Sequence, residues 1–425
     1  METPSRRSRA EGSRRSRLAR SLGDIGRFWG EERRALAVGA IALLLAATAD
    51  LGAGVVLSGA ESRIAALPGL LLLVPGAIAL RGATFGSFGA RLGTALVVGT
   101  YEPELRPGTW LWRHVEAVGV LTLVTSLEAA AFAWGVAQVL GQPTVPLSDL
   151  VVISTLGGLL ASVVLLLVTL GLARLSSLRG WSMDDVGAPA ITATGDLLTI
   201  PALLLATAAV GRGTPTTVAA WIIAAVTAAA LVYGLLHPRD TIRRLVRESV
   251  VVLSGAALVS VLAGAVLEGQ NELFLAVPVL LLLFPPFVAV FGSLGGILSS
   301  RLTSKLHLGL VTPDPRPDRE ALLEVSMTFL FALGVYVYVG ISAWALGNVL
   351  GVTTPPLPQL LGVSVVGGML GTFFLAIVAT TAATATYRLG LDPDNHAIPI
   401  VTSVMDFIGM LCLVGAVSLF QVGAT

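Results

Sequence analysis

Long apolar segments recur along almost the whole of this chain, and they limit its fold more than any other feature. Runs of about 20 apolar residues match the length of a helix that crosses a hydrocarbon core about 30 Å thick. Of the 425 residues, 55% are hydrophobic and only 12% are charged. A soluble domain would be about one quarter charged. The sequence therefore predicts an all-α polytopic membrane protein.

Proline, glycine and charged residues divide the apolar sequence into eleven candidate transmembrane helices. With the N-terminal tail inside the cell, 25 of the 27 Lys and Arg residues fall on the cytoplasmic side. This count includes the four arginines from Arg81 to Arg113. By the positive-inside rule, this predicts a cytoplasmic N-terminus and an external C-terminus in the plasma membrane. The predicted spans are 36–58, 67–88, 114–140, 149–173, 187–210, 216–236, 249–267, 273–298, 323–350, 357–386 and 397–421.

The sequence repeats itself at a constant spacing of 210 residues. At this offset the segment Leu67–Gly93 aligns with Val277–Thr303, and Asp196 aligns with Asp406. One offset holds without a gap over more than 130 positions, so the two halves are tandem duplicates. Each half has five spans, and the sixth helix lies between the halves. Both halves therefore enter the membrane in the same direction, which predicts a pseudo-two-fold axis along the membrane normal.

The duplication predicts four parts in the chain, which we expect to work as a single-chain pseudodimer in contact with membrane lipid. Basic residues stand in short clusters between apolar segments, so no nucleic-acid partner is expected. The parts are an Arg-rich cytoplasmic tail (1–35), a first five-helix repeat (36–211), a linking transmembrane helix with a basic cytoplasmic loop (212–245) and a second five-helix repeat (246–425).

Two aspartates stand at equivalent positions inside apolar segments. Asp196 lies about nine residues into the fifth segment, about 14 Å from its cytoplasmic edge, and Asp406 is its duplicate. Intramembrane acids are costly and usually face a water-filled cavity or a pathway. Thr192 and Thr402 precede the acids by four residues, so each helix presents hydroxyl and carboxylate oxygens on one face.

These four side chains are the predicted metal site. Oxygen ligands without Cys or His suit Mg²⁺, Mn²⁺ or Ca²⁺ better than a thiophilic metal. Mg²⁺ loses its water reluctantly, so we expect it to bind through retained waters. The ion is cargo in this interpretation, and acidic rings are known to select cations in pores.

Polar side chains also stand just before both of these helices. An acid at such a position can be the N-cap of its helix, or it can attract cations to a cytoplasmic mouth, and the two roles are compatible. The candidate mouth residues are Asp184, Asp185, Asp394 and Asn395.

Four segments of the chain resemble the membrane region of the MgtE family and of its eukaryotic relatives, the solute carrier 41 magnesium transporters. They are GSFGARL (86–92), GSLGGILSSRL (292–302), DDVGAPAITATGDLL (184–198) and DPDNHAIPIVTSVMD (392–406). The similarity extends from about residue 36 to the end.

The resemblance implies a divalent-cation pathway, chiefly for Mg²⁺, lined by the second and fifth helices of each half. In bacterial members two identical chains supply the halves, whereas one chain would supply both here. The family's central pore carboxylate corresponds to Asp196 and Asp406. Its small-residue motif corresponds to the pore-lining positions Gly82, Ala83, Gly292 and Ser293.

The chain also departs from the family pattern. Bacterial members commonly have Asn after the glycine of the small-residue motif, where this chain has Ala83 and Ser293. They also carry soluble Mg²⁺-sensing domains, whereas about 35 Arg-rich residues precede the first predicted span here. We therefore expect regulation to differ from theirs or to reside in the membrane part.

Two further acids, Asp50 and Glu128, occur in apolar segments of the first half only. Their counterparts in the second half are Ser260 and Tyr338. A buried acid of this kind can carry a coupling proton or Na⁺, which would make the protein an exchanger, or it can simply bond a neighbouring helix. Transport of an organic solute is a further alternative. No enzymatic activity is expected, because the sequence has no nucleotide-binding glycine loop, HExxH, GxSxG or CxxC motif.

Overall fold

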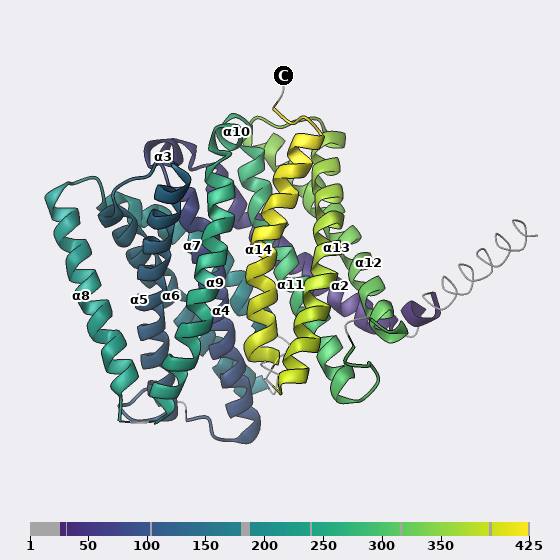
Figure 1. Cartoon of the computed structure of the whole chain (residues 1–425), viewed down its shortest axis with the longest axis horizontal. Helices are drawn as coiled ribbons and strands as arrows, with labels where there is room; N and C mark the ends of the chain where they lie inside the picture. The colour runs from purple at the N-terminus through teal and green to yellow at the C-terminus, as the bar shows by residue number, and fades with distance from the viewer. Residues whose placement is uncertain are drawn as a thin grey trace, which may run out of the picture.

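The computed structural model describes residues 26–30, 32–102, 104–179, 188–238, 240–314, 317–390 and 393–423. These residues form a helical bundle, and none of them lies in a β-strand (Figure 1). The helices are α2 (Arg33–Ser58), α3 (Glu61–Ala66), α4 (Leu70–Val98), α5 (Trp110–Leu140), α6 (Leu147–Arg179), α7 (Ala188–Ala206), α8 (Thr214–Leu236), α9 (Asp240–Glu268), α10 (Asn271–Ala276), α11 (Val279–His307), α12 (Arg319–Leu350), α13 (Leu357–Leu389) and α14 (Pro393–Leu419).

Eleven of these helices are long and apolar enough to cross a membrane, which confirms the predicted number. Boundaries differ most at the second span of each repeat. The predicted spans 67–88 and 273–298 both end too early, because α4 continues to Val98 and α11 continues to His307. The second of them also starts too early, because residues 271–276 form the separate short helix α10.

The duplication seen in the sequence is present in the helices. The bounds of α10 and α13 equal those of α3 and α6 shifted by 210 residues, and the other pairs agree within a few residues. The short helices α3 and α10 lie at the same end of the bundle, where the chain also ends (Figure 1). The two repeats therefore run in the same direction through the bundle, as predicted from the five spans of the first repeat plus one linking span.

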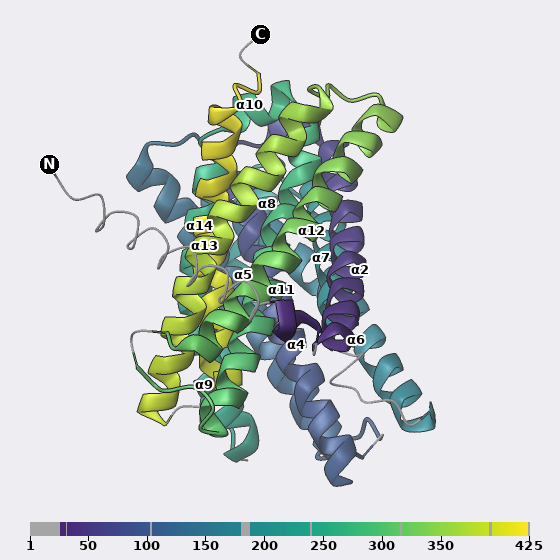
Figure 2. The same cartoon turned by 90° about the vertical axis from the view of Figure 1, so that its right-hand side faces the viewer.

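The first helix of each repeat packs between the repeats. α2 contacts α7 of its own repeat but also α11 and α12 of the other, and α9 contacts α14 together with α4 and α5 (Figure 2). Small residues permit the close approach. A Cβ atom on Gly54 of α2 would overlap the carbonyl oxygen of Leu282, and one on Gly264 of α9 would overlap that of Leu72. Small residues at such contacts are typical of transmembrane helix pairs.

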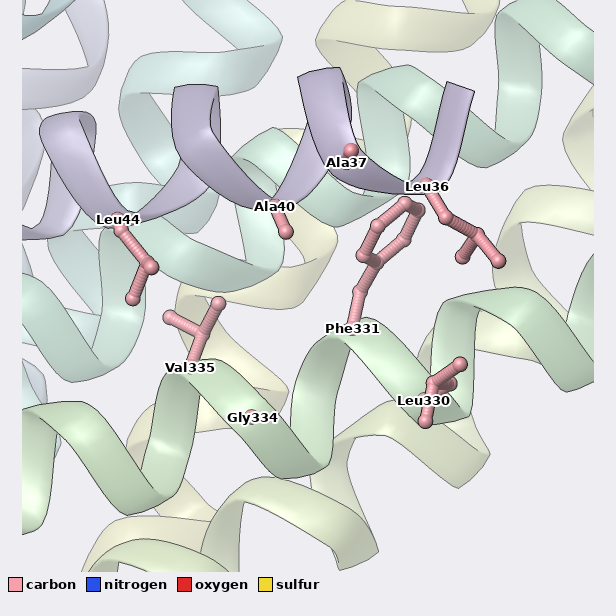
Figure 3. A pocket seen from close by; sticks show the side chains of 8 residues that line it. All are labelled: Leu36, Ala37, Ala40, Leu44, Leu330, Phe331, Gly334 and Val335. Atoms are coloured by element: carbon pink, nitrogen blue, oxygen red, sulfur yellow. The ribbon is translucent and has the colours of Figure 1, made fainter. Parts of the chain in front are cut away.

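The linking helix α8 makes the two repeats unequal. It packs against α5, α6 and α9, at the edge of the bundle in Figure 1. There Gly234 lies against Val246 and Val120. Leu36 and Leu330, at the corresponding positions of the other repeat, instead line an apolar crevice of about 340 Å³ between α2 and α12 (Figure 3). The helix α8 covers the junction between α5 and α9. No helix of the described chain covers the equivalent junction between α12 and α2.

Candidate functional site

The two predicted pathway acids lie on the last helix of each repeat. Asp196 is in the middle of α7, which packs against α2, α4 and α6, and its side chain is buried. Asp406 is half-buried on α14, which packs against α9, α11 and α13 and also touches α4. Their carboxyl groups are close enough to interact electrostatically. The duplicated acids therefore lie toward a common interior and not on opposite outer flanks.

Each acid contacts the first helix of its own repeat. Asp50 of α2 lies with its carboxyl group in hydrogen-bonding contact with that of Asp196. In the second repeat Ser260 of α9 donates a hydrogen bond of 2.9 Å from its hydroxyl to Oδ2 of Asp406. Asp50 and Ser260 are equivalent positions, so the two repeats share one geometry but differ in one ionisable group.

The predicted hydroxyl and small-residue positions lie together in each repeat. Gly82 of α4 faces the methyl group of Thr192 on α7, and Gly292 of α11 faces that of Thr402 on α14. The hydroxyl of Thr402 donates to the carbonyl oxygen of Pro399 at 3.1 Å. The second and fifth spans of each repeat are thus in contact at the residues that the sequence predicts.

The neighbouring positions Ala83 and Ser293 are both half-buried. Ala83 packs against an apolar cluster that includes Leu253 and Ala257 of α9. Ala83 therefore lies toward α9, the first helix of the other repeat.

Glu128 has a hydrogen-bond partner of its own. It is on α5 and accepts a hydrogen bond of 2.8 Å from the hydroxyl of Ser254 on α9. Its counterpart Tyr338 makes a hydrogen bond of 2.7 Å with the hydroxyl of Thr48 on α2. Each contact links the first helix of one repeat to the third span of the other, α9 to α5 and α2 to α12.

The predicted cytoplasmic mouth is described only in part. Asp184 and Asp185 lie outside the described residues. Asp394 and Asn395 belong to the first turn of α14, which begins at Pro393, and their side chains also lie outside the description.

A buried arginine was not expected from the sequence. We predicted Arg81 on the cytoplasmic side, but it lies within the membrane-spanning part of α4 and is 2% exposed. Its guanidinium donates to the hydroxyls of Thr125, Ser126 and Ser162 at 3.0–3.2 Å, and to the carbonyl of Gly158 at 3.3 Å. The available signal was its place inside the predicted span 67–88. The remaining cationic residues still favour the same orientation.

The described side chains around Asp196 and Asp406 do not by themselves form a complete set of metal ligands. Among the described residues, no three His, Cys, Asp or Glu side chains lie close enough together to hold a metal ion. Mg²⁺ commonly keeps several waters and binds through only one or two carboxylates.

Eleven described helices that are long and apolar enough to cross a membrane indicate an integral membrane protein. The comparisons agree. The model of the MgtE family, described as a divalent cation transporter, matches residues 74–206 and 284–416, together more than half of the chain. The chain belongs to the MgtE family, in two copies. The matched segments begin 210 residues apart, as in the duplication. Neither the curated proteins nor the solved structures contain a match.

Proposed function

We propose that this protein carries Mg²⁺, and other hard divalent cations such as Mn²⁺, along a pathway at the interface between its two repeats. The electrostatic interaction between Asp196 and Asp406 supports the proposal, because the two acids stand at equivalent positions of helices that are apolar enough to cross a membrane. Acids held at this depth without a function would only raise the cost of insertion. A passing divalent cation would offset their charge.

The pathway would be formed within one chain acting as a pseudodimer. Gly82, Gly292 and the nearby Ala83 and Ser293 would line it on the second spans, with Thr192 and Thr402 on the fifth spans. We place the N-terminus in the cytoplasm and the C-terminus outside, in the plasma membrane. Cations would enter past Asp184, Asp185, Asp394 and Asn395.

The test is Mg²⁺ uptake by proteoliposomes that contain the full chain. We expect Asp196→Asn and Asp406→Asn each to abolish most of the uptake, because each removes a charge from the path without a change of size. Glu272→Gln removes an exposed acid on α10 and should leave uptake unchanged. A Mg²⁺-uptake-deficient host should be rescued by the wild type only. Normal uptake by both aspartate variants would refute the proposal.

A coupled exchanger is the second candidate function. The additional acids Asp50 and Glu128, present in one repeat only, favour it, because an exchanger needs a group that also binds H⁺ or Na⁺. Mg²⁺ flux that responds to an imposed pH or Na⁺ gradient would support exchange, and strictly electrodiffusive flux would exclude it. An organic cargo would compete with Mg²⁺ in the same assay.

A further inference from the structure

Two carboxyl groups touch in the interior of the first repeat. The side chains of Asp50 and Asp196 are 2% and 8% exposed, and they are in hydrogen-bonding contact. No partner among the described residues donates to Oδ1 of Asp50. Ionised carboxylates only accept hydrogen bonds. The contact therefore requires a positive charge, either a proton or a metal cation, at the two oxygens.

In the second repeat the corresponding contact needs no added positive charge. There the hydroxyl of Ser260 supplies the proton that its hydrogen bond to Asp406 needs. Ser260 is fully buried and lies close to Gly76 of α4, so the contact is held within the packed interior. The first repeat thus has one more acid and one donor fewer at the same place.

The buried cation of the first repeat is engaged elsewhere. Arg81 lies on α4, which packs against α7, yet both of its terminal nitrogens donate to α5 and α6. Its partners there are neutral hydroxyls and a carbonyl. Arg81 therefore makes no hydrogen bond that would offset the two acids.

We propose that Asp50 is a cation ligand and that, with Asp196, it forms a two-carboxylate site for a hydrated divalent cation in the first repeat. This inference rests on the proposed function and refines its site. The cation would be held off the pseudo-two-fold axis, with Asp406 reached through water. Two carboxylates and several retained waters are a common ligand set for Mg²⁺. A duplicated fold would then contain an asymmetric site.

The duplication provides a matched set of variants. Mn²⁺ serves as the probe, with free Mn²⁺ measured by electron paramagnetic resonance on the purified full chain in detergent, and Mg²⁺ as competitor. We expect Asp50→Ser, which makes the first repeat like the second, to weaken binding by roughly tenfold or more, or about 1.4 kcal/mol. Adding Ser260→Asp moves the acid pair to the second repeat and should restore most of the affinity.

The inference would be overturned by a wild type that does not bind Mn²⁺, by an Asp50→Ser variant with unchanged affinity, or by a double variant as weak as Asp50→Ser alone. Asp50→Asn covers the case in which the serine variant does not fold. It keeps the size of the side chain and can donate to Asp196, so normal Mn²⁺ binding by this variant would show that the charge is not used. Uptake is measured separately. Binding without Mg²⁺ uptake would refute the proposed function and leave this site intact.

Discussion

Ser260 donates a 2.9 Å hydrogen bond to Asp406 at the position where the first repeat places Asp50 against Asp196. In a dimer of identical chains, a substitution changes both halves at once. In a duplicated chain each half can change alone. The serine and the aspartate are thus a difference that a dimer of identical chains cannot have, and they lie at the acids proposed to bind the cation.

Replacing Ser260 with alanine should destabilise the protein. The change removes the hydroxyl donor to the half-buried carboxyl group of Asp406, and a typical hydrogen bond contributes about 0.5–1.5 kcal/mol. The free energy of unfolding, measured by SDS titration in mixed micelles, should fall by this amount. Ser418→Ala is the control, because the hydroxyl of Ser418 is exposed and bonds only the carbonyl of Val414 on its own helix. Equal stability of the two variants would contradict the prediction.

α2 and α9 each approach a helix of the other repeat so closely that an added methyl group should lower the stability of the protein. Gly54→Ala and Gly264→Ala would each place a Cβ against a backbone carbonyl, which cannot move as a flexible side chain can. We expect each to lower the free energy of unfolding by about 1–3 kcal/mol. Gly255, on the same helix as Gly264, has no atom within 4 Å of such a Cβ. Gly255→Ala should therefore be neutral, or stabilising by up to about 1 kcal/mol.

Arg81 should not tolerate replacement by lysine. Its planar guanidinium reaches acceptors on α5 and α6 at the same time, and a single ammonium group cannot reproduce this fork. Loss of one hydrogen bond to a charged group costs about 1.5–3 kcal/mol, so Arg81→Lys should be less stable by that amount in the same titration. The exposed Arg106, which pairs with the nearby exposed Glu104, supplies the control Arg106→Lys. Its effect should stay within about 0.5 kcal/mol.

Asp318, the N-cap residue of α12, predicts a pH dependence of stability. Partial burial tends to raise the pKa of this carboxyl group, but hydrogen bonds from the backbone of Ala321 and from Thr312 outweigh burial and lower it below its usual value. Because the pKa is lower in the folded state, the stabilisation is complete above the unfolded pKa. It is lost as the pH falls through the folded value.

Asp318→Ala should therefore cost about 0.5–2 kcal/mol near neutral pH, the range for loss of an N-cap. The difference from the wild type should shrink as the pH is lowered below about 4. Unfolding is measured across this pH range. Asp314→Ala removes an exposed acid of the same loop and should show little difference at any pH. A constant gap between Asp318→Ala and the wild type down to acidic pH would refute the role of the ionised side chain.

The sequence by itself determined the number of spans, the duplication and the family. These follow from local properties, because a helix enters a bilayer according to the apolar length of its own segment, and a repeat is visible without any structure. It also determined that Asp196 and Asp406 are equivalent. Segment boundaries were less secure, since α10 is set apart from α11 by a turn in a continuous apolar stretch.

Only the tertiary structure decided which side chains meet. Asp50 and Asp196 are 146 positions apart, like Ser260 and Asp406. The local sequence around each residue does not predict which residue it contacts. Their contact depends on how α2 and α9 pack between the repeats, which small residues such as Gly54 permit. Arg81 is a similar case, because its hydroxyl partners come from other helices. Hydropathy acts along one segment, whereas contacts between helices depend on the shapes of both surfaces.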